Sequence, residues 1–344
     1  MTEPKRVRTA VVGCGYWGKN LVRNFAALSD LRACCDASEE VRGRLAAQLR
    51  DVRVTDAFEA VLDAPDVDAV VLATPAAMHA DMAIAALEAG KHVFVEKPLA
   101  LSVADAERAA AAADRCGRIL MVGHLLEYHP AVNYLKELID AGELGDVYYC
   151  YGQRVNLGKL RSDENALWSL APHDISIVLY LMGEEPEEVE ATGQAFLQPG
   201  IEDVVFLTLK FGSGRVAHIQ VSWLDPHKAR RLTVVGSKKM VVFDDMQPQE
   251  KVRIYDKGVD RRPGEAAPYA SYGELLSLRE GDIVIPRIPE REPLAIECEA
   301  FLKSVLTGIP PRSDAQDGVR VVRVLAAAQA KLADGHLAFH AAAS

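Results

Sequence analysis

Glu96 and Lys97 are the residues whose types and place in the sequence best suit chemistry, because they directly follow a short apolar run. Residues 92–95 (His-Val-Phe-Val) are typical of a buried parallel strand, since a strand covered on both faces is almost continuously hydrophobic. Ligands of open parallel α/β sheets bind beyond the carboxyl ends of the strands, so this cation and carboxylate would stand at the rim of a ligand site. Pro98 keeps Lys97 extended and prevents a helix from starting there. The alternative interpretation is an exposed Glu–Lys pair after an edge strand.

A glycine pattern, Gly-x-Gly-x-x-Gly at residues 13–18, follows the strand expected over residues 6–13 and opens a helix that extends to Leu28. Glycines at this spacing permit a tight turn and the close approach of a pyrophosphate, while the helix N-terminus offers free N–H groups and the positive end of its dipole. The pattern predicts a dinucleotide-binding loop; the alternative is a glycine-rich turn that binds nothing. The loop residues predicted to contact the cofactor are Gly13, Gly15, Tyr16, Trp17 and Gly18.

Asp36 ends the next expected strand, residues 31–35, and lies 18 positions after Gly18. In dinucleotide-binding folds, a carboxylate at about this distance accepts hydrogen bonds from the adenosine ribose. Because a carboxylate repels a 2′-phosphate, Asp36 favours NAD over NADP as the cofactor. Arg42 and Arg44 follow closely enough in the sequence to bind such a phosphate, so NADP stays an alternative.

Composition narrows the class of protein. The chain has 344 residues, which suggests two domains, and its 49% hydrophobic and 26% charged residues are typical of a globular protein. No apolar run approaches the roughly 18 residues that span a bilayer, and the first residues lack the apolar stretch of a signal peptide. The six cysteines form no CxxC pairs, so we expect free thiols in a reducing cytoplasm and no metal site. A net charge of −10 argues against a nucleic-acid partner.

Strand and helix patterns alternate over residues 1–123. Repeated strand–helix units of this length predict an α/β fold with a right-handed, doubly wound parallel sheet, which is a Rossmann domain. The strands are expected at residues 6–13, 31–35, 52–54, 68–73, 92–95 and 119–123.

Residues 124–344 follow a different pattern, in which strands come in succession after two helices. This predicts an α+β domain with an open, mostly antiparallel sheet. Helices would cover one face of that sheet and the other face would need a partner, so we expect a homodimer or homotetramer. A turn at residues 172–174 and a long loop at residues 256–289, rich in proline, glycine and charge, are also expected. Helices are expected at residues 130–140, 175–182, 293–306 and 313–332, and strands at residues 146–155, 188–196, 204–211, 215–223, 231–235, 240–244 and 251–255.

Four segments together carry a family resemblance: GCGYWG (13–18), ATPAAMH (73–79), AGKHVFVEKPL (89–99) and LWSLAPHDISI (167–177). With these motifs the chain resembles the glucose–fructose oxidoreductase, inositol dehydrogenase and MocA (Gfo/Idh/MocA) family of pyridine-nucleotide sugar dehydrogenases. The resemblance covers nearly the whole chain. It implies an NAD-dependent enzyme with an N-terminal cofactor domain and a C-terminal domain for substrate binding and oligomerisation.

The resemblance also assigns roles to residues at the strand ends. It implies that Lys97 lies beside the nicotinamide and the reacting carbinol carbon, where its ammonium would stabilise the developing alkoxide or share the role of base. It implies an often cis Lys97–Pro98 peptide bond and a Glu96 that approaches the nicotinamide ribose. His124 follows the last strand of the Rossmann domain and is placed to contact the nicotinamide. The other residues implied to line the cofactor groove are Thr74, Pro75 and His79.

His173 matches the second catalytic position of the family, where His or Tyr is usual. It would accept the proton of the substrate hydroxyl, directly or through water. Inositol-type members carry an Asp four residues earlier, but here that residue is Ser169, which weakens the inositol interpretation. Asp174 would orient His173 or bind substrate. The alternative for His173 is a structural hydrogen bond near a helix N-terminus.

A cluster of basic and polar residues precedes Trp168. Because arginine binds carboxylates and phosphates in a bidentate manner, the cluster predicts an anionic substrate; a solvated loop is the alternative. Members with similar GYWGKN and APHD segments resemble nucleotide-sugar dehydrogenases, including those that oxidise UDP-N-acetylglucosaminuronate at C3. An inositol or free-sugar dehydrogenase, a reductase working in the opposite direction and a non-catalytic NAD-binding sensor are the alternatives. The predicted substrate contacts are Arg154, Asn156, Arg161, Trp168, His173 and Asp174, with Lys159 in the same cluster.

Overall fold

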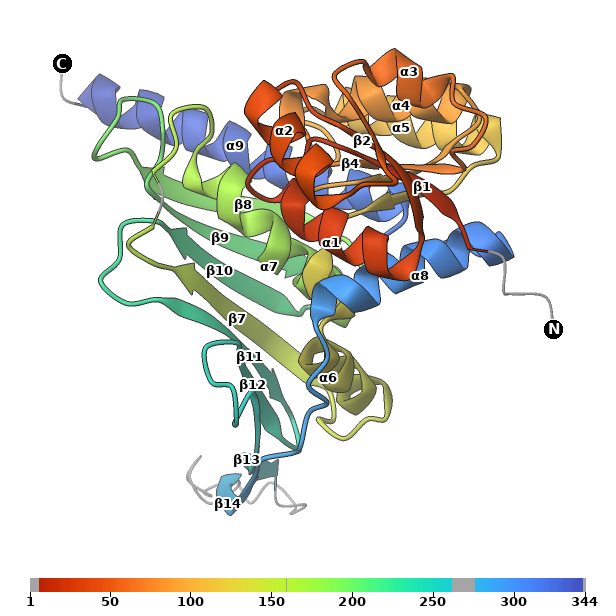
Figure 1. Cartoon of the computed structure of the whole chain (residues 1–344). Helices are drawn as coiled ribbons and strands as arrows, with labels where there is room; N and C mark the ends of the chain where they lie inside the picture. The colour runs from red at the N-terminus through yellow and green to blue at the C-terminus, as the bar shows by residue number, and fades with distance from the viewer. Residues whose placement is uncertain (1–5, 159, 262–275, 343–344) are drawn as a thin grey trace, which may run out of the picture. The chain divides into compact units, whose positions relative to one another are not determined.

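The computed structural model describes residues 6–158, 160–261 and 276–342, and the chain divides into two compact units (Figure 1). Unit 1 comprises residues 1–129 and 291–326, and unit 2 comprises residues 130–290 and 327–344. The sequence suggests a single boundary after residue 123, whereas the chain returns to unit 1 through residues 291–326. Among the described residues, every helix is too short or too polar to cross a membrane.

A six-stranded parallel sheet forms the centre of unit 1, with its strands in the order β3-β2-β1-β4-β5-β6. The predicted doubly wound parallel sheet is thereby confirmed. The strand order reverses between β1 and β4, which is the switch point at which sheets of this kind bind ligands. The strands are β1 Arg8–Val12, β2 Asp30–Cys35, β3 Arg53–Thr55, β4 Ala69–Leu72, β5 His92–Val95 and β6 Leu120–Val122.

Local signals explain where helices of unit 1 begin and end. Ser102 caps α5 by accepting the N–H of Asp105, and Gly117 ends the helix in the left-handed conformation. Five alanines of α5 are buried, which lets the helix pack closely on α4. The helices are α1 Gly18–Leu28, α2 Glu39–Gln48, α3 Phe58–Leu62, α4 His79–Glu88, α5 Val103–Cys116 and α8 Pro293–Thr307, with 3-10 helices η1 Ala76–Met78 and η2 Leu125–Tyr128.

Three phenylalanines from distant segments meet in the core of unit 1. Phe25 on α1, Phe94 on β5 and Phe301 on α8 are buried and pack edge to face, with ring centroids 5.7, 6.1 and 6.2 Å apart. Each such pair contributes about 0.5–1.5 kcal/mol beyond the burial of its area. Phe301 thus gives a physical reason why residues 291–326 belong to unit 1, since α8 packs on α1 and completes this core.

Unit 2 contains an eight-stranded sheet in the order β14-β13-β12-β11-β7-β10-β9-β8. Among the described strands of this eight-stranded sheet, only β7 and β10 pair in parallel, so the predicted open, mostly antiparallel sheet is confirmed. Helices α6 Pro130–Asp140 and α7 Ala166–Met182 pack on one face of it (Figure 1). The strands are β7 Val147–Val155, β8 Pro186–Gln194, β9 Val204–Phe211, β10 Val216–Ser222, β11 Ala229–Gly236, β12 Met240–Asp244, β13 Val252–Arg261 and β14 Leu276–Val284, and α9 Ala315–Ala342 is shared between the units.

The opposite face of this sheet exposes aromatic side chains. Tyr149 and Tyr151 alternate with the buried Cys150 along β7, and their rings stack with centroids 6.3 Å apart. On the neighbouring strands, Phe206 of β9 stacks on His218 of β10 in the same way. Residues that alternate in this manner belong to the face that α7 does not cover.

The prediction of a long loop at residues 256–289 is wrong for much of this segment. β13 and β14 pair as antiparallel strands over residues that the composition marked as irregular. Cross-strand hydrogen bonds supply an order that a polar, glycine-containing sequence does not indicate by itself. Residues 262–275, in the middle of this segment, lie outside the described residues.

The turn expected at residues 172–174 is also wrong, because α7 runs without a break from Ala166 to Met182. Asn165 caps the helix by accepting the N–H of Trp168 at 3.1 Å, and Pro172 lies inside it. A proline within a helix removes one N–H donor, but most residues of α7 are buried and this burial outweighs the missing hydrogen bond. His173 and Asp174 therefore project from a helix.

Candidate active site

The glycine loop between β1 and α1 has a separate physical need for each of its glycines. Gly13 has a φ of +82°, and a Cβ there would lie 2.7 Å from the main-chain carbon of Ala73. A Cβ on Gly18 would overlap the carbonyl oxygen of Gly13. A Cβ on Gly15 would meet nothing within 4 Å, so the main chain there is open to a ligand. Since α1 also begins without a side-chain cap on its first N–H groups, the loop fits a pyrophosphate.

Tyr16 and Trp17 occupy the two positions between Gly15 and Gly18. The Tyr16 side chain is 84% exposed, with the Lys19 ammonium 5.6 Å from the centre of its ring. Trp17 is 38% exposed and is the residue directly before α1. Both predicted cofactor residues therefore lie on the same loop and at the surface of unit 1.

Asp36 lies at the carboxyl end of β2, beside this loop. One carboxylate oxygen accepts the N–H of Cys14 at 2.6 Å and the other accepts the N–H of Ser38 at 2.8 Å. These bonds orient the carboxylate and leave lone pairs for the hydroxyls of a ribose. Arg42 and Arg44, which the sequence offered for a 2′-phosphate, donate instead to main-chain carbonyl groups. The geometry thus suits the ribose of NAD.

Glu96 and Lys97 follow the carboxyl end of β5. The Glu96 side chain is buried, and one of its oxygens accepts a hydrogen bond from the indole N–H of Trp17. The other oxygen accepts the main-chain N–H of Lys97 at 3.2 Å. Burial raises the pKa of the Glu96 carboxyl, while the Trp17 hydrogen bond and the charge of Lys97 oppose that rise. Lys97 itself is half-buried, and the Lys97–Pro98 peptide bond is cis.

Thr74, Pro75 and His79 follow the carboxyl end of β4, which is the strand between β1 and β5. Thr74 is half-buried and Pro75 is exposed, as residues lining a groove would be. The His79 imidazole is only 1% exposed and lies 2.8 Å from the carbonyl oxygens of both Thr74 and Pro98. His79 thus lies between the ends of β4 and β5, with one ring nitrogen facing each.

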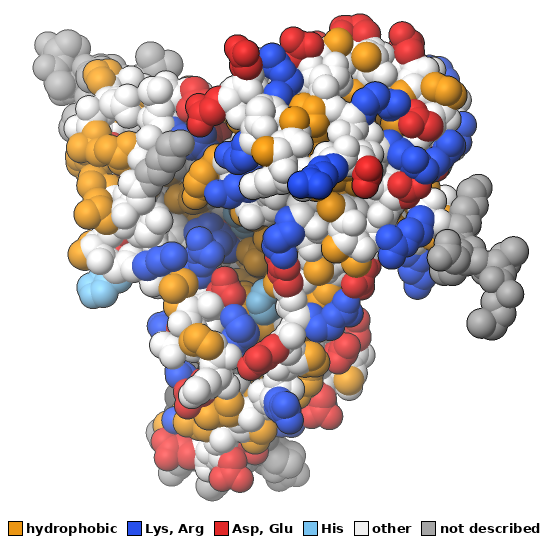
Figure 2. All heavy atoms as spheres, viewed as in Figure 1, with side chains coloured by type: hydrophobic (Ala, Val, Ile, Leu, Met, Phe, Trp, Pro, Cys, Tyr) orange, Lys and Arg blue, Asp and Glu red, His pale blue; other side chains and the backbone are white. Residues whose placement is uncertain are grey.

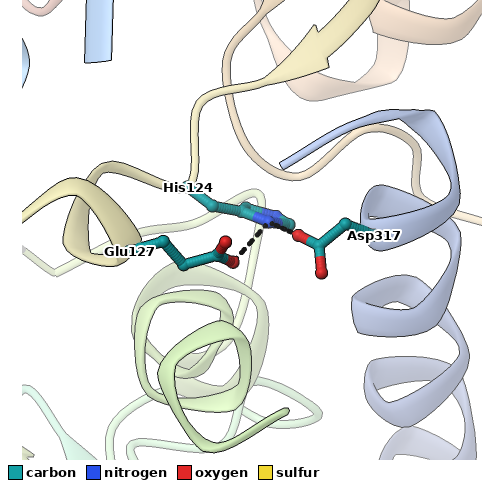
Figure 3. A group of neighbouring side chains, drawn as sticks. All are labelled: His124, Glu127 and Asp317. Carbon is teal, nitrogen blue, oxygen red and sulfur yellow. Dashed lines mark hydrogen bonds and ion pairs between the residues drawn. The ribbon is translucent and has the colours of Figure 1, made fainter. Parts of the chain in front are cut away.

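His124 follows β6 and is turned into the interior of unit 1. Its Nδ1 lies 2.6 Å from Asp317 on α9 and 3.5 Å from Glu127 on η2 (Figure 3). All three side chains are at most 2% exposed. The sequence placed His124 at the nicotinamide, and it gave no sign of the pairing with Asp317, which lies 193 positions away.

His124, Glu127 and Asp317, called the His124 cluster below, are three buried titratable groups in contact. Burial lowers the pKa of the imidazole, but the hydrogen bonds and negative charges of Asp317 and Glu127 outweigh it and raise the pKa to about 10. These three residues could together hold a metal ion, a ligand set that the sequence did not reveal. Because the imidazole nitrogen that faces both carboxylates is within hydrogen-bond distance of Asp317, we interpret the cluster as an imidazolium held by carboxylates. Glu297 on α8 is buried nearby, and burial raises the pKa of its carboxyl well above the usual value.

In unit 2, His173 and Asp174 are adjacent on α7. The Asp174 carboxylate accepts two hydrogen bonds from the guanidinium of Arg154 on β7, at 2.5 and 3.3 Å. Both partners are buried, while His173 is half-buried. Arg154 was expected to bind an anionic substrate, but its charge is balanced within unit 2. The ion pair joins β7 to the turn of α7 that carries His173.

The remaining predicted substrate residues lie at the two ends of the segment that joins β7 to α7. Asn156 is half-buried directly after β7, and Arg161 lies 3.3 Å from Glu164. Trp168 is half-buried, and its indole N–H donates to the side chain of Gln329 at 3.1 Å. Lys159 lies outside the described residues.

Comparison with known families matches both halves of the chain. A family model described as "Oxidoreductase family, NAD-binding Rossmann fold" matches residues 7–124. A second model, described as "GFO/IDH/MocA C-terminal domain", matches residues 132–242. The two matches together cover more than half of the chain.

Individual relatives align along most of their length. UDP-N-acetylglucosamine 3-dehydrogenase of Acidithiobacillus ferrooxidans is 30% identical over 323 residues, which cover 94% of this chain and 95% of that protein. A solved structure of that enzyme has a TM-score of 0.79 at 28% identity and covers 96% of this chain and 98% of its own. The scyllo-inositol 2-dehydrogenase (NAD(+)) of Bacillus subtilis is 30% identical over 272 residues, 74% of this chain and 78% of that protein. A structure of GenD2 from gentamicin A biosynthesis in complex with NAD has a TM-score of 0.81 at 26% identity, covering 97% of this chain and 96% of that one.

Proposed function

The chain belongs to the Gfo/Idh/MocA family of oxidoreductases, and we propose that it oxidises a ring hydroxyl of a nucleotide-linked amino sugar. Its N-terminal part is an NAD-binding Rossmann domain, and the glycine loop and Asp36 described above fit that cofactor. Bound NAD supplies the nicotinamide ring that accepts the hydride. The observation that carries the proposal is the position of Lys97. It is half-buried directly after β5, and its main-chain N–H bonds to Glu96, which in turn accepts a hydrogen bond from Trp17 of the cofactor loop.

Lys97 and His173 divide the proposed chemistry between them. The C–H bond of the carbinol carbon breaks with transfer of a hydride, the O–H bond loses its proton, and a ketone forms. The Lys97 ammonium stabilises the negative charge that develops on the oxygen. The His173 imidazole accepts the hydroxyl proton, directly or through a water molecule, and passes it to solvent.

UDP-N-acetylglucosamine, whose sugar ring carries no carboxylate, is the substrate we favour. The end-to-end similarity to a UDP-N-acetylglucosamine 3-dehydrogenase supports a nucleotide sugar oxidised at C3. The support for a uronate substrate was the basic cluster before Trp168. Arg154 of that cluster is paired with the carboxylate of Asp174, which weakens this support. An inositol substrate has weaker support, since Ser169 stands where inositol-type members carry an Asp.

Reduction of NAD by a panel of sugars tests the proposal. The purified protein is supplied with NAD and with UDP-N-acetylglucosamine, the corresponding uronate, free N-acetylglucosamine or scyllo-inositol, and NADH formation is followed by absorbance. We expect the highest kcat/KM with UDP-N-acetylglucosamine and a product whose new carbonyl group is at C3. Equal turnover of scyllo-inositol would overturn the substrate assignment. Binding of NADH without turnover of any sugar would favour a non-catalytic sensor.

We further infer that the protein is a homo-oligomer that pairs through the exposed face of the sheet in unit 2. The support is the row of aromatic side chains on that face, Tyr149, Tyr151 and Phe206, because contiguous exposed apolar surface marks interaction sites. Light scattering on the wild type and on a Tyr151→Lys variant tests this. We expect a dimer or tetramer that the substitution dissociates, and a monomeric wild type would contradict the inference.

A further inference from the structure

Trp17 and Glu96 connect two segments that the proposed reaction needs in a fixed arrangement. Trp17 closes the glycine loop after β1, and Glu96 follows β5, with β4 lying between these strands in the sheet. The indole N–H of Trp17 donates to one oxygen of Glu96, and the other oxygen accepts the main-chain N–H of Lys97. A continuous chain of hydrogen bonds therefore runs from the loop to the lysine.

The Glu96 carboxyl has little freedom to leave this position. Its main-chain N–H bonds to the carbonyl of Leu72 on β4 at 2.9 Å. On the side of β6, a Cβ on Gly123 would lie 3.1 Å from a carboxylate oxygen of Glu96, so only a glycine leaves the carboxyl undisturbed there. The side chain is 9% exposed, and a buried carboxyl is costly to leave without its hydrogen bonds. The strand ends thus confine Glu96 to the place where Trp17 meets it.

His79 provides a comparable connection one strand away. Its ring links the carbonyl groups of Thr74 after β4 and Pro98 after β5. The ends of β1, β4 and β5 are consequently held together by two polar bridges, one from an indole and one from an imidazole. Both bridges end on a residue next to Lys97, either Glu96 or Pro98, but only the bridge from Trp17 begins in the cofactor loop.

We propose that Trp17 is a positioning residue, whose indole N–H holds the Glu96 carboxylate and through it the main chain at Lys97, so that the cofactor loop and the lysine adopt one arrangement together. The proposal rests on the proposed function, because that function makes Lys97 the catalytic group. Trp17 acts through Glu96 and needs no contact with the reacting atoms. It follows that loss of the indole N–H impairs the chemical step more than the binding of substrate.

Two Trp→Phe variants form a matched pair for the test. Trp17→Phe keeps an aromatic ring and removes the N–H donor to Glu96. Trp223→Phe makes the same change in unit 2, where the indole N–H of Trp223 donates to the buried Asp203 at 2.6 Å. We expect Trp17→Phe to lower kcat about 10- to 100-fold, the effect of losing one hydrogen bond to a charged group, with KM for the sugar nearly unchanged. Trp223→Phe should lower the melting temperature and leave kcat as in the wild type.

A double variant examines whether Trp17 works through Glu96. If it does, Trp17→Phe adds little to the loss of kcat that Glu96→Met causes, because the first change removes the donor and the second removes the acceptor of the same hydrogen bond. Effects on kcat that multiply in the double variant would show that the two residues act independently. Equal losses of kcat in Trp17→Phe and Trp223→Phe would also overturn the proposal, since the loss would then reflect general destabilisation.

Labelling of Lys97 gives a readout that does not depend on turnover. The protein is treated with an amine-reactive reagent in the presence and absence of NADH, and the modification of Lys97 is quantified by peptide mapping. We expect NADH to protect Lys97 strongly in the wild type and in Trp223→Phe, and weakly in Trp17→Phe, while ADP-ribose binds all three proteins alike. Unchanged protection in Trp17→Phe overturns the proposal. If the wild type turns over no sugar, the proposed function fails, and the labelling result alone decides the role of Trp17.

Discussion

The Nδ1 atom of His124 lies 2.6 Å from a carboxylate oxygen of Asp317, a residue 193 positions further along the chain. His124 follows β6 and Asp317 lies in the first turn of α9, so the pair ties the last strand of the parallel sheet to a helix from the end of the chain (Figure 3). Arg320 approaches the other oxygen of Asp317 at 2.6 Å. The carboxylate is therefore shared by two cationic groups, and the contact is best understood as a buried ion pair.

The stability that His124 contributes should decline in alkaline solution. The pKa of the imidazole rises from its ordinary value of 6.5 to about 10 in the folded protein, so its contribution is complete below about pH 6.5 and is lost as the pH rises through 10. We expect the difference in unfolding free energy between wild type and His124→Gln to shrink over this interval, by up to about 1.4 kcal/mol for each pH unit. Urea denaturation at a series of pH values measures this difference.

Chelation provides the control for this interpretation of the cluster. A metal ion held by His124, Glu127 and Asp317 would need a deprotonated imidazole, so its stabilising effect would grow with pH and vanish in EDTA. The imidazolium interpretation predicts that EDTA leaves the melting temperature of the wild type unchanged. A melting temperature that falls on chelation and recovers on adding a divalent metal would contradict it.

Removing the charge of Lys97 should impair the chemical step. Lys97→Met keeps much of the length of the side chain and abolishes the ammonium that would stabilise the developing alkoxide. By analogy with the loss of an oxyanion-hole donor, we expect kcat to fall about 100- to 1,000-fold with little change in NADH affinity. Lys303→Met, on the exposed side of α8, is the control and should behave as the wild type in steady-state kinetics. A Lys97→Met enzyme with normal kcat would remove the basis of the proposed mechanism.

His173 should matter through its ability to accept a proton. Glutamine is polar and of similar size but cannot act as a base, so we expect His173→Gln to lower kcat about 100- to 10,000-fold near neutral pH. The loss should become smaller as hydroxide concentration rises, because hydroxide can replace the missing base. His227→Gln serves as the control, since that side chain is 89% exposed. Measurement of kcat against pH distinguishes a lost base, which gives this partial recovery, from damage to the fold, which does not.

Much of the fold could be predicted because its signals are local. Short apolar runs between amphipathic helices are enough to predict a doubly wound sheet, and the strands of unit 2 have clear alternation. The return of α8 to unit 1 has no local signal, since it depends on Phe301 meeting Phe25 and Phe94 from distant segments. The pairing of β13 with β14 was missed for the same reason, because a charged strand gains its order from its neighbour.

The same distinction between local signals and long-range contacts applies to the candidate site. The glycine loop and Asp36 are short-range motifs, and the sequence predicts both a place and a chemical reason for each. The side-chain partners of functional residues are long-range, so the sequence did not reveal that Trp17 meets Glu96. Arg154 is an example. In the sequence, an arginine near the predicted substrate site suggests an anionic ligand, and only the fold shows that Arg154 forms an ion pair with Asp174.

The need for glycine at position 18 can be tested against a glycine that has no such need. A Cβ on Gly18 would overlap the main chain at Gly13, so we expect Gly18→Ala to displace the loop and to weaken NADH binding by at least about tenfold. Gly43, inside α2, would place its Cβ in open space, and Gly43→Ala should stabilise the protein by about 0.5–1 kcal/mol. Equilibrium dialysis with NADH and thermal melts of both variants measure these effects. Wild-type NADH affinity in Gly18→Ala would contradict the close packing of the loop.

Arg154 and Asp174 allow the structural and the substrate-binding roles of an arginine to be separated. Arg154→Met leaves the buried carboxylate of Asp174 without its partner, so we expect a loss of about 3–5 kcal/mol in unfolding free energy. Arg154→Met combined with Asp174→Leu removes both charges and should recover most of that loss, because well-packed apolar residues replace buried ion pairs at little cost. Chemical denaturation of the single and double variants measures both quantities.

The sequence-based interpretation of Arg154 makes the opposite prediction. If the guanidinium bound a phosphate or carboxylate of the substrate, Arg154→Met would raise KM for the sugar nucleotide, leave the unfolding free energy nearly unchanged, and show no rescue by the second substitution. The two hydrogen bonds to Asp174 at 2.5 and 3.3 Å occupy the Nε and one terminal nitrogen of the guanidinium, which is the edge best suited to bidentate binding of an anion. We therefore expect stability to change first, and any change in kcat to follow from the altered support of His173 on the same helix turn.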